Sequence, residues 1–186
     1  MNRRHLLQAL APLLLLRAGV APAQFAAKAA PKQSVAELQR DWKVLLASNA
    51  KVAVDATPIV KSDDEWRKEL APEAYDVLRH EGTERPFTSP LNDEHRAGIF
   101  VCAGCALPLF SSAMKFDSGT GWPSFFTRIP GVFVEKTDHK LILPRTEYHC
   151  VKCGGHHGHV FDDGPPPTGL RYCNNGVALR FIAAQV

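Results

Sequence analysis

The stretch Thr146-Glu147-Tyr148-His149-Cys150-Val151-Lys152-Cys153-Gly154-Gly155 decides the fold. It starts as a β-prone run and ends in a Cys-x-x-Cys pair followed by two glycines, which favour a tight turn. A matching pair, Cys102-Ala103-Gly104-Cys105, follows another β-prone run at residues 99–101. Two residues between thiols let both sulfurs reach one metal, and two such pairs can saturate a tetrahedral zinc ion. Four ligands are therefore expected to hold one zinc: Cys102, Cys105, Cys150 and Cys153.

The predicted zinc site is structural rather than catalytic, because four thiolates leave no open coordination position. Such a site would join distant parts of the chain. Two other uses of the same cysteines stay open at this point. An oxidising compartment favours disulfides, and a Cys-x-x-Cys pair can also be redox-active.

Beyond residue 99, glycine, proline and turn clusters separate short β-prone runs, which is the pattern of a compact antiparallel β domain. A further short strand is expected within residues 51–59. The runs of the β domain cover residues 99–101, 124–129, 132–136, 140–143, 146–150, 159–161, 170–173 and 178–182.

Helices are expected only ahead of this domain, and each has a recognisable start. Ser34 and Glu37 form a capping box for a helix that runs to about residue 47. A second box at residues 62–65 starts a helix through about residue 70. Pro72 fits the first turn of a third helix over residues 73–80, with Gly82 as its C-terminal stop. The first helix carries an apolar stripe that should pack on the domain or on a partner: Val35, Leu38, Trp42, Leu45 and Leu46.

The first 23 residues are typical of an export signal. Arg3-Arg4 precede an apolar run at residues 6–16, which is shorter than the roughly 20 residues that span a bilayer, so no stable membrane anchor is expected. Ala21 and Ala23 provide the small residues that a signal peptidase requires. The arginine pair resembles a twin-arginine signal for periplasmic export. An ordinary secretory signal and a mitochondrial transit peptide are the alternatives.

The formal charge of +3 comes from that signal, because Arg3, Arg4 and Arg17 are its only charged residues. The rest of the chain has 19 basic and 19 acidic residues, so its charge does not argue for the basic face expected of a nucleic-acid-binding protein, and no such partner is expected. The predicted organisation is an export signal at 1–23, a linker with the first helix at 24–61, and one domain at 62–183.

Cys173 is the fifth cysteine and has no partner pair. In the run Arg171-Tyr172-Cys173-Asn174-Asn175, strand alternation would place Arg171, Cys173 and Asn175 on one face. The guanidinium would then favour the thiolate and lower the cysteine pKa, and the Asn175 amide could donate to an acid/base group. The alternative is an inert buried cysteine beside a surface arginine.

Two further motifs offer groups that could serve either chemistry or packing. The run His156-His157-Gly158-His159 could bring an imidazole to Cys173 to deliver a proton, although three histidines could equally bind metal or serve the structure. Trp122, in the run Gly119-Thr120-Gly121-Trp122-Pro123, is either a core residue or an exposed indole suited to a methyl-thioether.

These motifs in this order resemble the B-type peptide-methionine (R)-S-oxide reductases. The resemblance covers about residues 62–183 and includes residues 115–125, 156–161 and 171–175 with both cysteine pairs. It implies a mainly β (α+β) fold with two antiparallel sheets, short N-terminal helices and a structural zinc. It also implies that oxidised proteins carrying methionine sulfoxide are the substrate.

The resemblance assigns roles to single residues. Cys173 would attack the sulfoxide sulfur, and His159 with His156 would orient and protonate the sulfoxide oxygen. Trp122 would hold the substrate methyl group, while Arg171 and Asn175 support the thiolate and the histidines. The products would be methionine and a sulfenic acid on the cysteine. Strict alternation would pair His157 with His159, so a departure from regular strand is expected there.

Thr120 departs from the family pattern, because many members carry a resolving cysteine at this position. With the other thiols assigned to zinc, we expect a one-cysteine cycle in which a thioredoxin-like protein, glutaredoxin or a small thiol reduces Cys173. Two functions of other classes stay open: a thiol-based redox sensor switched at Cys173, and a zinc-knuckle binding module without chemistry.

Overall fold

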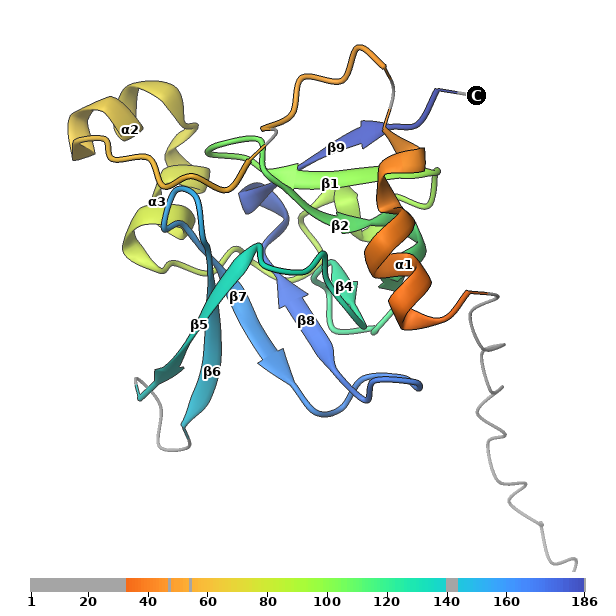
Figure 1. Cartoon of the computed structure of the whole chain (residues 1–186). Helices are drawn as coiled ribbons and strands as arrows, with labels where there is room; N and C mark the ends of the chain where they lie inside the picture. Colours follow the sequence, from red (N-terminus) through yellow and green to blue (C-terminus); the bar gives the residue numbers. More distant parts are fainter. Residues whose placement is uncertain (1–32, 47, 54, 140–143, 186) are drawn as a thin grey trace, which may run out of the picture.

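Two antiparallel β-sheets make up most of the protein, as expected from the sequence (Figure 1). The computed structural model describes residues 33–46, 48–53, 55–139 and 144–185. The smaller sheet has the strand order β2-β1-β9, formed by Pro108–Ser111, Gly98–Cys102 and Leu179–Ala183. The larger sheet has the order β3-β4-β8-β7-β6-β5, and its strands are Lys115–Phe116, Ser124–Phe125, Arg171–Asn174, His156–Phe161, Arg145–Cys150 and Phe133–Asp138.

Aromatic side chains from both sheets form the core. Phe110 of β2 stacks on Phe125 of β4 with ring centroids 3.9 Å apart, and Phe100 of β1 meets the same ring edge-on at 5.0 Å. Tyr148 and Tyr172 extend the cluster along the larger sheet. Burial of each large apolar side chain contributes about 1.5–3 kcal/mol. This cluster therefore fixes the two sheets relative to each other.

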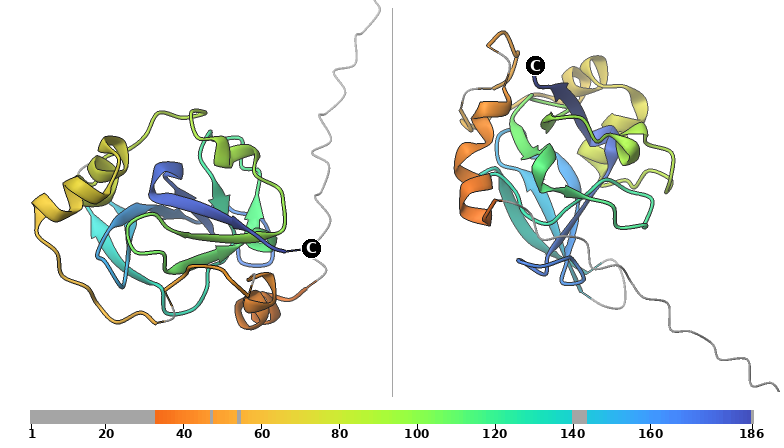
Figure 2. Two further views of the ribbon diagram at one scale, coloured as in Figure 1. Left: turned by 90° about the horizontal axis from the view of Figure 1, so that it is seen from above. Right: turned by 90° about the vertical axis from the view of Figure 1, so that its right-hand side faces the viewer.

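The first helix packs on the β domain. Its start is the predicted capping box, with both reciprocal hydrogen bonds between Ser34 and Glu37. The α-helix α1 covers Val35–Asp41 and continues as a short 3-10 helix, η1, over Trp42–Leu45. Leu38 is buried in the core, and η1 lies against β1 and β2 (Figure 2).

Two further helices lie at the far side of the domain from α1 (Figure 1). They are α2, Asp63–Glu69, and α3, Pro72–His80, and their starts agree with the sequence-based expectation. α3 ends at His80, as predicted. The residue in the left-handed position that follows is Glu81, with φ of 56°, rather than the expected Gly82.

Several predicted strands differ from the observed ones. β4 ends at Phe125 rather than at residue 129, because the chain then turns to meet the smaller sheet, where Ile129 N–H donates to Leu109 O. The described part of residues 51–59 contains no strand, although Ala53 N–H donates to Ala106 O. β2 and β3 were not predicted. The expected run at 140–143 and the export signal lie outside the described residues.

In the part of the chain that the structure describes, no helix has the length and apolar character needed to cross a membrane.

Candidate functional site

A cavity of about 250 Å³ brings five of the predicted site residues together. Its wall includes side chains from β7, from β8 and from the turn before β4. The predicted residues in the wall are Trp122, His159, Arg171, Cys173 and Asn175. Thr120 and Arg145 also line it, and neither was predicted as a site residue.

The strand register places Cys173 next to its neighbours. β8 lies inside the larger sheet between β4 and β7, with Cys173 opposite Ser124 on one side and opposite His159 on the other. Directly opposite residues of antiparallel strands have Cβ atoms about 4.5–5.5 Å apart. The pairing alone therefore sets the imidazole beside the thiol. Tyr172, one residue away, points into the core as alternation requires.

Gly158 permits a close approach of β7 to the cysteine. A Cβ atom built on this residue would lie 2.0 Å from the carbonyl oxygen of Cys173. That oxygen also accepts a hydrogen bond from the Tyr148 hydroxyl at 3.2 Å. The backbone of Cys173 is thus held from two strands at once.

Burial raises the pKa of the Cys173 thiol above its ordinary value. The positive charge of Arg171 and a hydrogen bond with the Thr120 side chain act in the opposite direction, but they are the smaller effects. Arg171 thus acts on the cysteine pKa in the predicted direction, but burial outweighs it and the net shift is upward. At neutral pH the resting cysteine is therefore a thiol.

Three hydroxyl groups form a hydrogen-bonded chain that starts beside Cys173. The Thr120 hydroxyl lies 2.9 Å from that of Ser118, which lies 2.8 Å from that of Ser124. Ser124 donates its own proton to Trp122 O at 3.1 Å. Because each hydroxyl has one proton, Ser118 must donate to Ser124, and Thr120 to Ser118. Thr120 can then only accept from the Cys173 thiol.

Arg171 is held beside the thiol by Asp163. The carboxylate accepts two parallel hydrogen bonds from the guanidinium, at 2.7 and 2.8 Å. Such forked pairs fix direction as well as distance. The face of the same guanidinium lies 4.3 Å from the ring centroid of Phe161. The cation therefore has one orientation, with its positive charge close to Cys173.

The histidines separate into two groups because β7 carries a bulge. His149 pairs with His156, whereas Tyr148 pairs with Gly158, so His157 is the extra residue. The expected departure from regular strand is present. It turns His156 toward His159, with ring centroids 5.5 Å apart, and sends His157 against Tyr148 in the core.

His159 lines the cavity and is oriented by Asp138 of β5. Its Nε2 lies 2.9 Å from a carboxylate oxygen that also accepts from Arg145. Burial lowers the pKa of His159 below its ordinary value, although the Asp138 hydrogen bond acts to raise it. The ring is therefore neutral at pH 7 and Nε2 carries its proton. Nδ1 is the nitrogen left to exchange a proton with a ligand in the cavity.

His156 lies behind His159 and does not line the cavity. It is 1% exposed, and its Nδ1 lies 3.3 Å from the Glu147 carboxylate. The same carboxylate lies 3.2 Å from Nε2 of His149. His156 is thus placed to orient His159 rather than to touch a molecule in the cavity.

Glu84 positions two of the predicted residues. Its carbonyl oxygen accepts from Trp122 Nε1 at 3.1 Å, and its backbone N–H donates to the side-chain oxygen of Asn175 at 3.0 Å. The Asn175 amide donates to His157 O at 3.0 Å. Asn175 therefore bonds to backbone atoms, and not to an acid/base side chain as the sequence suggested.

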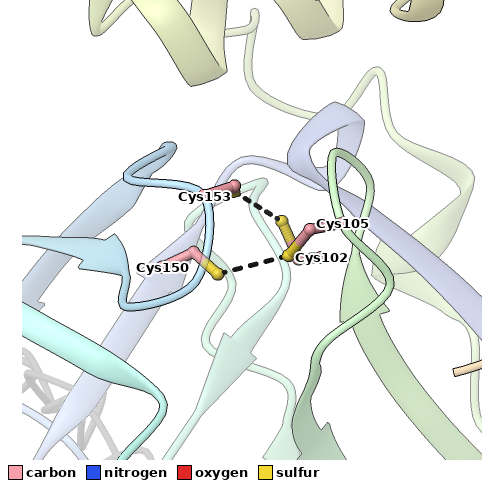
Figure 3. Close-up of side chains that lie close together, drawn as sticks. All are labelled: Cys102, Cys105, Cys150 and Cys153. Carbon is pink, nitrogen blue, oxygen red and sulfur yellow. Dashed lines mark hydrogen bonds between the residues drawn. The ribbon is translucent and has the colours of Figure 1, made fainter. Parts of the chain in front are cut away.

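The remaining four cysteines gather at the junction of the two sheets (Figure 3). Cys102 ends β1 of the smaller sheet and Cys150 ends β6 of the larger one. The Cys102 and Cys153 sulfurs are 3.6 Å apart, and those of Cys105 and Cys150 are 3.5 Å apart. These separations exclude S–S bonds of about 2 Å. They fit four thiolates around one ion, since zinc–sulfur bonds of 2.3 Å give tetrahedral edges of about 3.8 Å.

Comparison with known proteins shows that this chain is similar to one family. The SelR domain matches residues 70–183. A protein of Agrobacterium fabrum called peptide methionine sulfoxide reductase MsrB is 54% identical over 122 residues, which are 65% of this chain and 90% of that protein. Two proteins of the same name, from Thiobacillus denitrificans and Bradyrhizobium diazoefficiens, are 55% and 51% identical, and the matches cover 65% and 71% of this chain and 92% and 96% of theirs.

Proposed function

Since the chain belongs to the MsrB family of peptide methionine sulfoxide reductases, we propose that it reduces the R epimer of protein-bound methionine sulfoxide through a covalent cycle on Cys173. The family makes the protein an oxidoreductase that acts on methionine sulfoxide. The observation that supports the covalent cycle is one cavity in which Cys173, His159 and Trp122 meet.

In the first half of the cycle, the Cys173 sulfur attacks the sulfoxide sulfur. The thiol proton moves by way of His159 to the sulfoxide oxygen, which becomes a better leaving group. The oxygen then passes to Cys173 as methionine leaves, so the cysteine becomes a sulfenic acid. The sulfoxide gains two electrons and the thiol loses two, and no further reactant is needed.

The surrounding residues favour this step in distinct ways. Trp122, fixed by Glu84, offers an apolar face for the substrate methyl group. Arg171 stabilises negative charge on the Cys173 sulfur as the thiol ionises. Asp138 keeps the His159 ring in one orientation.

An external thiol completes the cycle in this proposal. One thiol attacks the sulfenic sulfur and releases water, leaving a mixed disulfide, and a second thiol restores the Cys173 thiol and leaves as a disulfide. All five cysteines lie within the described residues, and four of them belong to the cluster between the sheets. Thr120 occupies the position next to Cys173 where an internal thiol would be needed.

We also propose that the cysteine cluster binds one structural zinc ion, and that the enzyme is exported. The four sulfurs supply a closed thiolate shell, so the ion would link the sheets without taking part in the reaction. Export, by a twin-arginine-like signal at residues 1–23, rests on the sequence alone. Amino-terminal sequencing of the protein recovered from a periplasmic fraction tests it, and a chain that still begins at Met1 would contradict it.

Turnover of separated sulfoxide epimers tests the central proposal. With dithiothreitol as reductant, repeated consumption of the R epimer of an N-acetylated methionine sulfoxide amide is expected, with none of the S epimer. Cys173→Ser should abolish turnover while thermal unfolding stays unchanged. Reaction that stops after one equivalent per protein would favour the redox sensor, and zinc-loaded protein without any reaction would favour the binding module.

A further inference from the structure

A second hollow lies beside the cavity of Cys173 and shares one wall with it. Trp122 lines both the cavity of about 250 Å³ and the hollow of about 290 Å³. Two more aromatic residues, Phe87 and Phe116, line this second hollow together with charged and polar residues that include Asp93 and Asp117. Aromatic residues therefore extend from the Cys173 cavity into the second hollow.

Phe87 is held on the surface in a conformation that its side chain disfavours. The residue is 72% exposed and has φ of 64°, in the left-handed region that costs a non-glycine residue about 1 kcal/mol or more. An exposed aromatic side chain lacks the stabilising free energy that burial would give, and the left-handed backbone destabilises the folded protein further. An exposed, strained aromatic residue beside a reactive cavity indicates a binding role.

The surrounding backbone enforces this position. The Phe87 N–H donates to Gly121 O at 2.7 Å, and Asn92 Nδ2 donates to the same oxygen at 2.9 Å. Gly121 needs to be glycine, because a Cβ atom there would lie 2.8 Å from the Phe87 ring. Lys115 Nζ donates to Asn92 O at 2.6 Å. These hydrogen bonds hold the backbone at Phe87 in place beside the hollow.

We propose that Phe87, Phe116 and Trp122 form a subsite for an apolar side chain one or two residues away from the methionine sulfoxide in a polypeptide substrate. The inference rests on the proposed function. An extended chain advances about 3.3 Å per residue. The substrate backbone one or two residues away from the methionine sulfoxide is therefore displaced by at most about 7 Å. With the sulfoxide methyl on one side of Trp122, the side chain of such a neighbouring residue can reach the hollow on the other side.

The subsite predicts a preference, among polypeptide substrates, for those with an apolar residue next to the methionine sulfoxide. Peptides with leucine on both sides of the sulfoxide should have a higher kcat/KM than peptides with glycine there, by roughly tenfold, and the difference should lie mainly in KM. Phe87→Gly should remove that difference without loss on N-acetylated methionine sulfoxide amide, since glycine tolerates the left-handed backbone. Phe87→Leu should retain most of it.

One control variant and the contrary outcomes complete the test. Val44→Ala changes another exposed apolar residue, 81% exposed on η1, and should alter neither substrate. Equal kcat/KM for both peptides in the wild type, or an equal loss on peptide and small substrate in Phe87→Gly, would overturn the subsite. Absence of wild-type turnover on the small substrate would instead refute the proposed function.

Discussion

The hydroxyl chain at Cys173 predicts that two neighbouring substitutions shift the thiol pKa in opposite directions. In the resting site the Thr120 proton points to Ser118, so Thr120 only accepts from the thiol. When the thiol ionises, the Thr120 hydroxyl must turn its proton to the sulfur and give up its bond to Ser118. Thr120→Val removes this donor from the thiolate. Ser118→Ala removes the competing acceptor.

The magnitudes follow from the two kinds of hydrogen bond. A bond to a charged group is worth about 1.5–3 kcal/mol, and the neutral bond to Ser118 that Thr120 gives up is worth about 0.5–1.5 kcal/mol. The net effect is about 1 kcal/mol and one pKa unit corresponds to 1.36 kcal/mol, so Thr120→Val should raise the Cys173 pKa by about one unit. Ser118→Ala removes the neutral bond alone and should therefore lower the pKa by up to about one unit.

The pH dependence of alkylation measures both shifts. Zinc-loaded protein is treated with iodoacetamide, and the Cys173 peptide is followed by mass spectrometry, separately from the four clustered cysteines. Thr120→Ser keeps the hydroxyl and should behave like the wild type. An unchanged pKa in Thr120→Val, or a shift of the same sign in Ser118→Ala, would refute this account of the chain.

Three further substitutions test other parts of the site. Asp138→Asn removes the carboxylate that acts to raise the His159 pKa, so the limb of the kcat/KM–pH profile that reports this histidine should move to lower pH; a fixed limb would contradict the pairing. Cys150→Ser should abolish zinc binding measured by elemental analysis and lower the unfolding temperature by more than about 10 °C, because a structural zinc contributes as much as the whole free energy of unfolding; unchanged melting would dismiss the structural role. Gly158→Ala places a methyl group against Cys173 O and should lower the free energy of unfolding by about 1–3 kcal/mol, measured by denaturant titration. Turnover should be lost even where the variant is folded. Wild-type stability and turnover would show instead that β7 and β8 can move apart at this position.

Local signals predicted most of the fold, and pairing between distant residues explains what they missed. The capping boxes at Ser34 and Ser62 act within four residues, so the helix starts could be predicted. β2 and β3 are short runs whose place is set by their partner strands, and no periodicity marks them. The bulge at His157 depends on the register with β6, which the sequence of β7 alone does not contain.

The residues of the site also divide into those that a local motif predicts and those that only pairing between distant residues brings together. The residues at 171, 173 and 175 share one motif, and the structure places all three on the cavity wall. Their supporting partners come from elsewhere: Glu84 is 91 residues from Asn175 along the chain, and Asp138 is 21 residues from His159. The pKa of Cys173 could not be predicted either, because the effect of burial, which exceeds that of Arg171, exists only in the folded protein.

The position of Cys173 on an interior strand has a kinetic consequence. β4 and β7 pair with this strand on its two sides, so in the proposed cycle the backbone of the oxidised cysteine would not move out to meet a reductant. The reducing thiol would then have to enter the same space that methionine has just left. The two reactants therefore exclude each other. Double-reciprocal plots should give parallel lines, and an excess of the reductant should compete with sulfoxide for the reduced enzyme.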